Sequence, residues 1–335
     1  MNGMVAVTGA EGFIGSHLVE LLVARGHRVR AMAQYNSFGS WGWLDTLPAE
    51  TMEAVEVVPG DVRDPLSVQN LILCGGQEVE VVYHLAALIA IPYSYQAPRS
   101  YVETNVQGTL NVLEAVRHLG TPRLVHTSTS ETYGTARTVP IGEGHPLQAQ
   151  SPYAASKVGA DKLAESYHAS FGVPVVTLRP FNTFGPRQSA RAFIPTVISQ
   201  IAAGADVVRV GALDPTRDFT FVRDTAEAFV AVGTAPARDV VGQVFNAGTG
   251  QEVSMGDVAR EIAELMGREV EFHSEAARHR PSASEVMRLV CDGTKLGDAT
   301  GWRPGHTREE GLKPTIEWFL DEDNLARYKP GTYHV

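Results

Sequence analysis

Tyr153 and Lys157 are the residues whose types and spacing most clearly suggest chemistry. They lie four residues apart in the run Ser151-Pro-Tyr-Ala-Ala-Ser-Lys157, so a helix would place both side chains on one face. An ammonium group close to a phenol favours the phenolate. Lowering a tyrosine pKa from about 10 to about 7 takes roughly 4 kcal/mol, which two close cations in a partly desolvated cleft could supply. We therefore expect Tyr153 to serve as a general base near neutral pH.

A glycine-rich turn upstream of this pair predicts a dinucleotide site. Gly9, Gly12 and Gly15 follow a strand-like run and open a helical pattern, the context in which the backbone can approach a pyrophosphate. A tight turn without a ligand is the alternative. The positive nicotinamide ring of NAD or NADP would act on Tyr153 together with Lys157. The expected cofactor-binding residues are Gly9, Gly12, Phe13, Ile14, Gly15, Tyr35, Asn36, Ser37, Asp61, Val62, Leu85, Ala86, Ala87, Tyr153 and Lys157.

One expected part of such a site is absent from the sequence. An acid at the end of the second strand normally holds the adenosine ribose hydroxyls, but Ala33 and Gln34 stand there. No arginine follows at once to bind a 2'-phosphate, which slightly favours NAD over NADP. Asp61 closes a later strand and could accept a hydrogen bond from the adenine amino group or cap a helix. His84 is expected to be a packed histidine.

The elements that must position these residues alternate between strand and helix. Repeated βαβ units predict an α/β fold with a Rossmann-type, doubly wound parallel sheet. A smaller lobe is expected to be interleaved with it: residues 1–180, with return segments at about 224–266, form the dinucleotide domain, and 181–223 and 267–335 form the substrate lobe. The expected strands are Val5 to Thr8, Arg28 to Ala33, Val55 to Val58, Val79 to Leu85, Arg123 to Thr127, Val173 to Leu178 and Val244 to Ala247, with helices ending near Arg25 and spanning about 65–73, 99–119, 153–171, 193–203 and 252–266.

The composition excludes several classes of protein. The 335 residues are 44% hydrophobic and carry a formal net charge of −10, with no Lys/Arg run, which argues against a nucleic-acid surface. The longest apolar stretch, Val79 to Pro92, is shorter than the ~20 residues of a membrane helix. Cys74 and Cys291 are too few for a disulfide framework and suggest reduced thiols. We expect a cytoplasmic enzyme without a metal site.

Four motifs together resemble the extended short-chain dehydrogenase/reductase family, over essentially the whole chain. They are Gly9-x-x-Gly12-x-x-Gly15, His84-Leu-Ala-Ala87, Tyr153-x-x-x-Lys157 and Arg179-Pro-Phe-Asn182. Members act on nucleotide sugars as epimerases, dehydratases or decarboxylases. They usually form homodimers through two helices, which would correspond here to residues 99–119 and 153–171.

The triplet Thr129-Ser130-Glu131 bears on the type of reaction. Related epimerases usually have a small neutral residue at the position of Glu131. The resemblance implies that Thr129 binds the sugar 4-hydroxyl and that Glu131 removes the C5 proton after oxidation at C4, so that water is lost and hydride returns to C6. Many hexose 4,6-dehydratases have Asp-Glu here, whereas Ser130-Glu131 resembles GDP-mannose 4,6-dehydratases. UDP-glucuronate decarboxylases share the triplet, so a decarboxylase and a 4-epimerase are alternatives, as is a non-catalytic NAD(P)-sensing regulator.

Two further stretches resemble hexosamine 4,6-dehydratases of the legionaminic-acid type, which act on nucleotide-linked N-acetylglucosamine. They are residues 35–44, with Trp41 and Trp43, and Arg280 to Arg288. Trp41 and Trp43 could stack on a ring or cover the edge of a core. The family resemblance implies that Asn182, Arg217 and Arg280 contact the substrate diphosphate, and Arg187 is expected to reach the substrate as well. Arginine suits bidentate binding of phosphate, although each arginine alone could equally form a surface ion pair.

Overall fold

A parallel sheet forms the centre of the computed structural model, which describes residues 3–73 and 78–328. Within these residues the sheet has seven strands in the order β11-β6-β5-β4-β1-β2-β3, each pair parallel. Its members are β1 (Met4–Thr8), β2 (Arg28–Gln34), β3 (Val55–Gly60), β4 (Val79–His84), β5 (Leu124–Thr127), β6 (Val175–Pro180) and β11 (Val244–Ala247). The expected Rossmann-type sheet is therefore confirmed.

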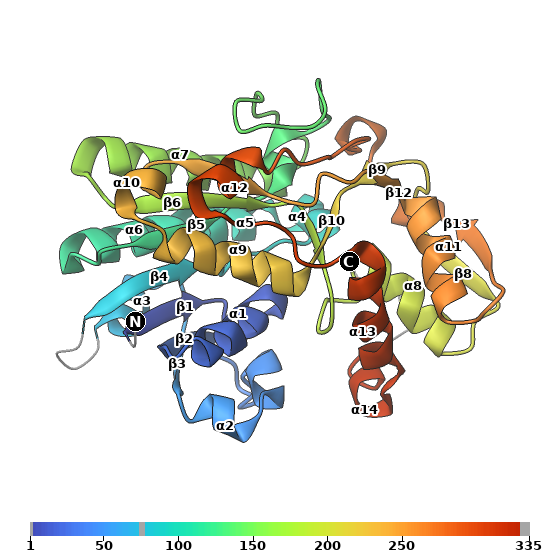
Figure 1. Ribbon diagram of the computed structural model, residues 1–335, viewed down its shortest axis with the longest axis horizontal. Coiled ribbons are helices and arrows are strands. Elements are labelled where there is room, and N and C mark those ends of the chain that lie inside the picture. Colours follow the sequence, from blue (N-terminus) through green and yellow to red (C-terminus); the bar gives the residue numbers. More distant parts are fainter. Residues whose placement is uncertain (1–2, 74–77, 329–335) are drawn as a thin grey trace.

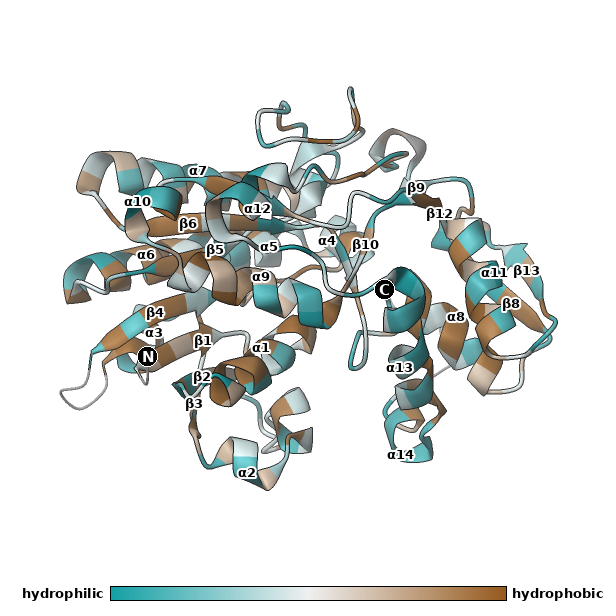
Figure 2. Cartoon of the chain, in the orientation of Figure 1, coloured by the Kyte–Doolittle hydropathy of each residue, from teal (hydrophilic) through white to brown (hydrophobic). Residues whose placement is uncertain are grey.

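Helices cover both faces of the sheet, as buried parallel strands require (Figure 1). The residues of β1 alternate between two cores: Val5 and Val7 face one side, and Met4 and Ala6 face the other. The first core includes α1 (Phe13–Ala24), α9 (Val222–Thr234) and α12 (Thr294–Thr300), and the second includes α3 (Pro65–Ile72), α6 (Gly108–Leu119) and α7 (Pro152–Phe171). In Figure 2 the central strands are accordingly mostly hydrophobic.

A smaller lobe has its own apolar core beside the carboxyl ends of the central strands. It is built on α8 (Phe193–Ala202), α11 (Met255–Leu265) and α13 (Arg308–Leu320). Short strand pairs complete it: β8 (Val207–Val210) with β13 (Glu271–Ser274), β10 (Phe219–Phe221) with β7 (Asn182–Phe184), and β12 (Val253–Ser254) with β9 (Thr216–Arg217). The remaining helical segments are η1 (Gly42–Thr46), α2 (Ala49–Met52), α4 (Ile91–Gln96), α5 (Pro98–Tyr101), η2 (Val102–Gln107), η3 (Ser130–Tyr133), α10 (Ala237–Val240), η4 (Ala276–Arg278), η5 (Ser282–Ser284) and α14 (Glu322–Leu325).

The packing differs from the expected elements at three places. The helix expected over residues 99–119 is a run of α5, the π-helical η2 and α6. Helix α11 was expected to return to the dinucleotide domain, but its Val258 and Ile262 lie in the core of the smaller lobe. The apolar face of α11 packs against α8. Helix α12 was expected in the substrate lobe, but its Leu296 lies in the first core of the central sheet. The domain boundaries otherwise stay a prediction.

Local sequence signals begin the two helices that matter most for the site. The Ser151 side chain caps α7 by accepting from the Ala154 N–H at 3.1 Å, and Pro152 occupies the first turn, where its missing N–H costs nothing. Gly12 stands at the N-cap of α1. Within residues 3–73 and 78–328, no helix is long and apolar enough to cross a membrane, and no His/Cys/Asp/Glu group could hold a metal ion.

Candidate active site

The predicted catalytic residues gather where β5 ends and α7 begins. Thr129 follows β5 and caps η3, accepting a hydrogen bond from the Glu131 N–H at 3.2 Å. The Tyr153 phenol, on the first turn of α7, is hydrogen-bonded to the Thr129 side chain. Ser130 is buried beside them. The structure thus brings Tyr153, Thr129 and Glu131 together, as expected from the carboxyl end of a parallel strand.

Lys157 lies on the same face of α7 as Tyr153, but its ammonium group is directed to the backbone. Its Nζ donates to the Thr127 carbonyl at 2.6 Å, and burial lowers the pKa of Lys157 to about 8. Burial raises the pKa of Tyr153, and the nearby Glu131 carboxylate raises it further, while the Thr129 hydrogen bond opposes both. The lowered phenol pKa was expected from Lys157 acting together with the nicotinamide cation, so it stays a prediction for the enzyme with its cofactor bound.

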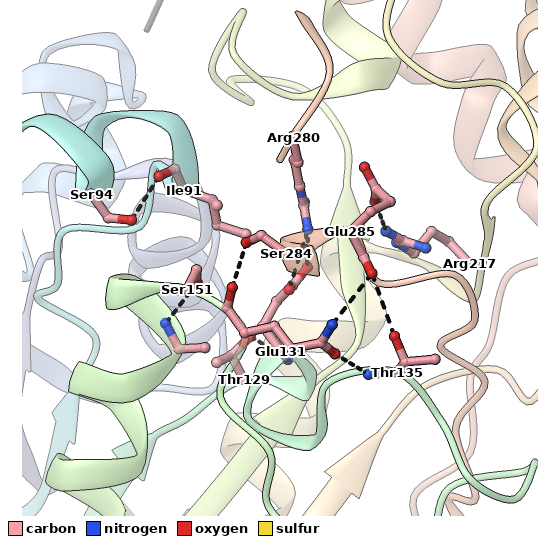
Figure 3. A network of polar contacts seen from close by, with 12 residues as sticks. Ile91, Ser94, Thr129, Glu131, Thr135, Ser151, Arg217, Arg280, Ser284 and Glu285 are labelled. Carbon is pink, nitrogen blue, oxygen red and sulfur yellow. Dashed lines mark hydrogen bonds and ion pairs between the residues drawn. The ribbon is translucent and has the colours of Figure 1, made fainter. Parts of the chain in front are cut away.

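Glu131 faces an arginine from the smaller lobe. Its carboxylate forms an ion pair with Arg280, with Nη1 and Oε1 3.4 Å apart, and 12% of the Glu131 side chain is exposed. Arg217 is buried nearby and contacts Glu285 at 3.5 Å. Figure 3 shows Arg280 directed toward Glu131, and Glu285 beside Arg217. Both distances exceed the 2.7–2.9 Å typical of strong charged hydrogen bonds, so both guanidinium groups hold their carboxylates loosely.

The predicted phosphate-binding residues do not all lie together. Arg217 and Arg280 act on each other and on Glu131 electrostatically. Asn182 begins β7, and its buried Oδ1 has no hydrogen-bond partner among the described residues. Arg187 instead reaches α1, where its Nη1 donates to Glu20 at 2.7 Å. The structure therefore does not bring Arg187 to the Arg217–Arg280 cluster.

The glycine-rich turn has the shape that a dinucleotide needs. Gly9 has φ +66°, and a Cβ there would lie 2.7 Å from the Ala86 backbone nitrogen. A Cβ on Gly15 would collide with the Gly9 carbonyl oxygen. Leu85 and Ala86 are held by N–H groups that donate to Thr8 Oγ1. The turn, Phe13, Ile14 and the small Ala87 thus leave the N-terminus of α1 accessible to a pyrophosphate, which fits the expected NAD or NADP.

Other predicted cofactor residues have local partners. Asp61 accepts from the Arg63 side chain at 2.6 Å, and this hydrogen bond lowers the Asp61 pKa. Asn36 folds onto its own loop and donates to the Ser40 carbonyl at 2.7 Å, with the exposed Tyr35 and Ser37 on either side. Val62 is buried against Gly108.

His84 and Trp43 have the packing roles considered for them, whereas Trp41 does not. His84 is buried and contacts Thr8 Oγ1 at 2.8 Å and Thr109 Oγ1 at 3.0 Å. Trp43 packs edge-on against Trp318 at a ring distance of 5.4 Å, while Trp41 is partly exposed. Cys291 is a free, buried thiol, and Cys74 lies outside the described residues.

Three residues near the site escaped the sequence analysis. Asn105 in η2 donates to Ser156 Oγ and to the Leu88 carbonyl, both at 2.9 Å. Glu285 contacts Arg217, and Asp161 of α7 accepts hydrogen bonds from neighbouring strands. Asp161 lies four residues after Lys157, so the spacing of helix faces could have revealed it. The π-helical turn at Asn105 has no comparable signal.

Comparisons with known proteins agree with this geometry. The family model for GDP-mannose 4,6 dehydratase matches residues 6–315. A UDP-glucose 4-epimerase of Mycolicibacterium smegmatis is 35% identical, covering 94% of this chain and 98% of the relative. A dTDP-glucose 4,6-dehydratase of Xanthomonas campestris is 32% identical, covering 94% and 92%. A UDP-N-acetyl-alpha-D-glucosaminuronate decarboxylase of Bacillus cytotoxicus is also 32% identical, covering 97% and 100%.

Solved structures agree with the fold and with the class of cofactor. A dTDP-glucose 4,6-dehydratase from Streptomyces venezuelae, solved with NAD, superposes with a TM-score of 0.83 at 27% identity, covering 98% of this chain and 99% of that one. Other similar structures hold NAD or NADPH, in line with the cofactor expected from the sequence. The chain is therefore an enzyme that belongs to the GDP-mannose 4,6-dehydratase family, within the extended short-chain dehydrogenases/reductases.

Proposed function

We propose that this enzyme converts a nucleotide-diphosphate hexose to its 4-keto-6-deoxy form by loss of water, using NAD or NADP. The observation that carries the proposal is the position of Glu131, a carboxylate two residues from the Thr129 hydroxyl that binds the Tyr153 phenol. A second acid–base group beside Tyr153 is what removal of a C5 proton requires. Simple epimerisation at C4 has no use for it.

The cofactor, when bound, supplies a hydride acceptor and donor. The residues that would hold it are the glycine turn from Gly9 to Gly15, the loop after β4 and the Tyr153–Lys157 helix. A nicotinamide cation near Tyr153 would counter the burial that raises the pKa of this phenol. Tyr153 can then take the proton of the sugar 4-hydroxyl, which Thr129 orients through a hydrogen bond.

Glu131 accounts for the steps after oxidation at C4. The new ketone acidifies the C5–H bond, and Glu131 accepts that proton. The C6–O bond then breaks, and Glu131 returns the proton to the leaving hydroxyl, so that water departs. The C5–C6 double bond left behind would take back the hydride at C6 and a proton at C5, which gives the 4-keto-6-deoxy sugar without net oxidation. Arg280 must release Glu131 for this to occur, and the substrate diphosphate is a suitable new partner for Arg280, with Arg217 close by.

The proposed substrate is a nucleotide-linked N-acetylglucosamine. Support comes from the resemblance of residues 35–44 and 280–288 to hexosamine dehydratases. A decarboxylase acting on a nucleotide-linked uronic acid is the second candidate, because the Thr-Ser-Glu triplet and the B. cytotoxicus relative favour it. Release of carbon dioxide from such a uronic acid would identify that activity.

Mass spectrometry on a panel of nucleotide sugars tests the proposal directly. We expect the product of one substrate to have lost one water, with no net oxidation. Glu131→Gln should still reduce the cofactor at 340 nm yet stop elimination, with turnover lower by on the order of 10²–10⁴. Tyr153→Phe is the matched control, because it should block the first step as well. Full turnover by Glu131→Gln would refute the assigned role.

A further inference from the structure

The end of β2 lacks the acid that usually binds adenosine. Ala33 pairs with Pro59 and Gln34 with Gly60, so the carboxyl end of β2 is well defined. Its Gln34 side chain carries no charge. A bound dinucleotide would therefore find no carboxylate from this strand for its ribose hydroxyls.

A carboxylate from the glycine-rich turn lies at this same place. Glu11 stands between Gly9 and Gly12, and its Oε1 accepts the Gln34 backbone N–H at 3.0 Å. Its Oε2 is buried and has no hydrogen-bond partner among the described residues. Burial raises the pKa of Glu11, opposed by its backbone hydrogen bonds. Oε2 has thus lost contact with water and has no donor, which is costly unless a ligand supplies one.

The loop after β2 holds Glu11 in this position. The Trp43 N–H donates to the Glu11 carbonyl at 3.0 Å. Gly42 has φ +58°, and a Cβ there would lie 2.8 Å from the same carbonyl oxygen. Across the sheet edge, Arg63 already binds Asp61 through two nitrogens. The ends of β2 and β3 therefore have beside them a Glu11 oxygen without a hydrogen-bond partner and an arginine, Arg63, that is already paired with Asp61.

We propose that Glu11 is the residue that selects the cofactor of this enzyme. Its Oε2 accepts hydrogen bonds from the adenosine ribose hydroxyls and excludes the 2'-phosphate of NADP. This inference rests on the dinucleotide site of the proposed function. A hydroxyl satisfies the buried oxygen, whereas a phosphate beside it brings two anions together in a desolvated place. Glu11, which lies in the glycine turn, thus replaces the acid that is absent from the end of β2 as the partner of the adenosine ribose.

Dinucleotide binding without any sugar tests this role. Calorimetry should show the wild-type enzyme binding NAD at least about tenfold more tightly than NADP. Glu11→Gln keeps an acceptor for the Gln34 N–H and should weaken NAD roughly tenfold or more, because a hydrogen bond to a charged group is lost. NADP affinity should hold or rise, so the preference collapses. Glu11→Ala removes the carboxylate altogether and gives the same comparison if the amide variant does not fold.

Glu53→Gln provides the matched control, since it removes the same charge from an exposed residue at the end of α2. It should leave the NAD to NADP ratio unchanged. If Glu11→Gln and Glu11→Ala bind both dinucleotides with the wild-type ratio, the role of Glu11 is overturned while the cofactor site stands. If the wild-type enzyme binds neither dinucleotide, the proposed function fails together with this inference.

Discussion

Lys157 keeps an ammonium group inside the protein, where its Nζ binds the Thr127 carbonyl. Burial lowers its pKa from 10.5 to about 8, and the Asp161 carboxylate limits the fall. At pH 7 the lysine is protonated both folded and unfolded, but between pH 8 and 10.5 only the unfolded chain holds the proton. Stability therefore rises with pH across this window. The drop corresponds to about 3 kcal/mol of destabilisation below pH 8.

Lys157→Met removes this titration and so isolates it. We expect the unfolding free energy of the wild-type enzyme, relative to that of the variant, to increase by up to about 3 kcal/mol between pH 7 and pH 10. Urea unfolding of both proteins at several pH values measures the difference, in which other titrating groups cancel. A difference that is constant with pH would mean that Lys157 has an ordinary pKa.

Single residues show where sequence reasoning succeeds and where it stops. The spacing of Tyr153 and Lys157 was enough to place both on one helix face, since helical geometry is local. The burial of Tyr153 was not accessible, because it depends on distant segments such as Tyr101, whose ring lies 6.3 Å from that of Tyr153. Glu11 was likewise hidden, because its partner Gln34 is distant in the sequence.

Helix α7 is joined to the sheet by a buried polar network. Asp161 accepts hydrogen bonds from Arg179 of β6 at 2.8 Å, from His126 of β5 at 3.1 Å and from Ser128 at 2.8 Å. Burial alone would raise the pKa of Asp161, but His126 and Arg179 hold it at about 2. The network fixes the height of α7 over the ends of β5 and β6, and with it the position of Tyr153.

Arg179→Met should destabilise the enzyme by about 3–5 kcal/mol, because it leaves the Asp161 carboxylate buried without its partner. The double variant Asp161→Asn/Arg179→Met removes both charges and should recover a large part of this loss. Chemical denaturation of the two single variants and the double variant gives the coupling energy. Strictly additive effects would contradict a linked network.

The elements of the central sheet were easier to predict than those of the smaller lobe. Strands such as Met4–Thr8 are almost wholly apolar and buried, and alternating helices imply parallel order. The two-residue strands β9 and β12 exist only because they pair with each other across a long loop. Helix α9 also escaped prediction. It follows a loop-like segment, and its N-cap residue is Phe221, whose side chain cannot cap a helix and so gives no signal of a helix start in the sequence.

At the scale of the whole molecule, one loop of the smaller lobe joins the two lobes over the site. Ser284 lies 2.5 Å from the Tyr95 hydroxyl and also donates to the Gln150 carbonyl. Figure 3 shows Ser284 in the same polar network as Arg280 and Glu285. Arg280 and Glu285 come from the same loop. The candidate active site is therefore assembled from both lobes, and its arginines are placed only when the whole chain has folded.

The expected homodimer would bury the outer face of the α6–α7 pair. Val102, Leu119 and Phe171 are exposed on these helices and their extension. We expect light scattering to give about twice the 36.1 kDa of one chain. Val102→Glu should yield monomers, since a charge in an apolar interface is costly. Leu66→Glu, at an exposed position of α3, is the control that should leave the dimer intact. A wild-type monomer at micromolar concentration would contradict the expectation.

The loose pairing of Arg280 with Glu131 has a consequence for how nucleotide capture responds to salt. An incoming diphosphate replaces Glu131 as the partner of Arg280. Added salt therefore screens both the Arg280–Glu131 contact that is lost and the Arg280–diphosphate contact that is gained. Affinity for the nucleotide should therefore vary only weakly with ionic strength. In Glu131→Gln the internal competitor is gone, and a steeper dependence in titrations from low to high salt should appear.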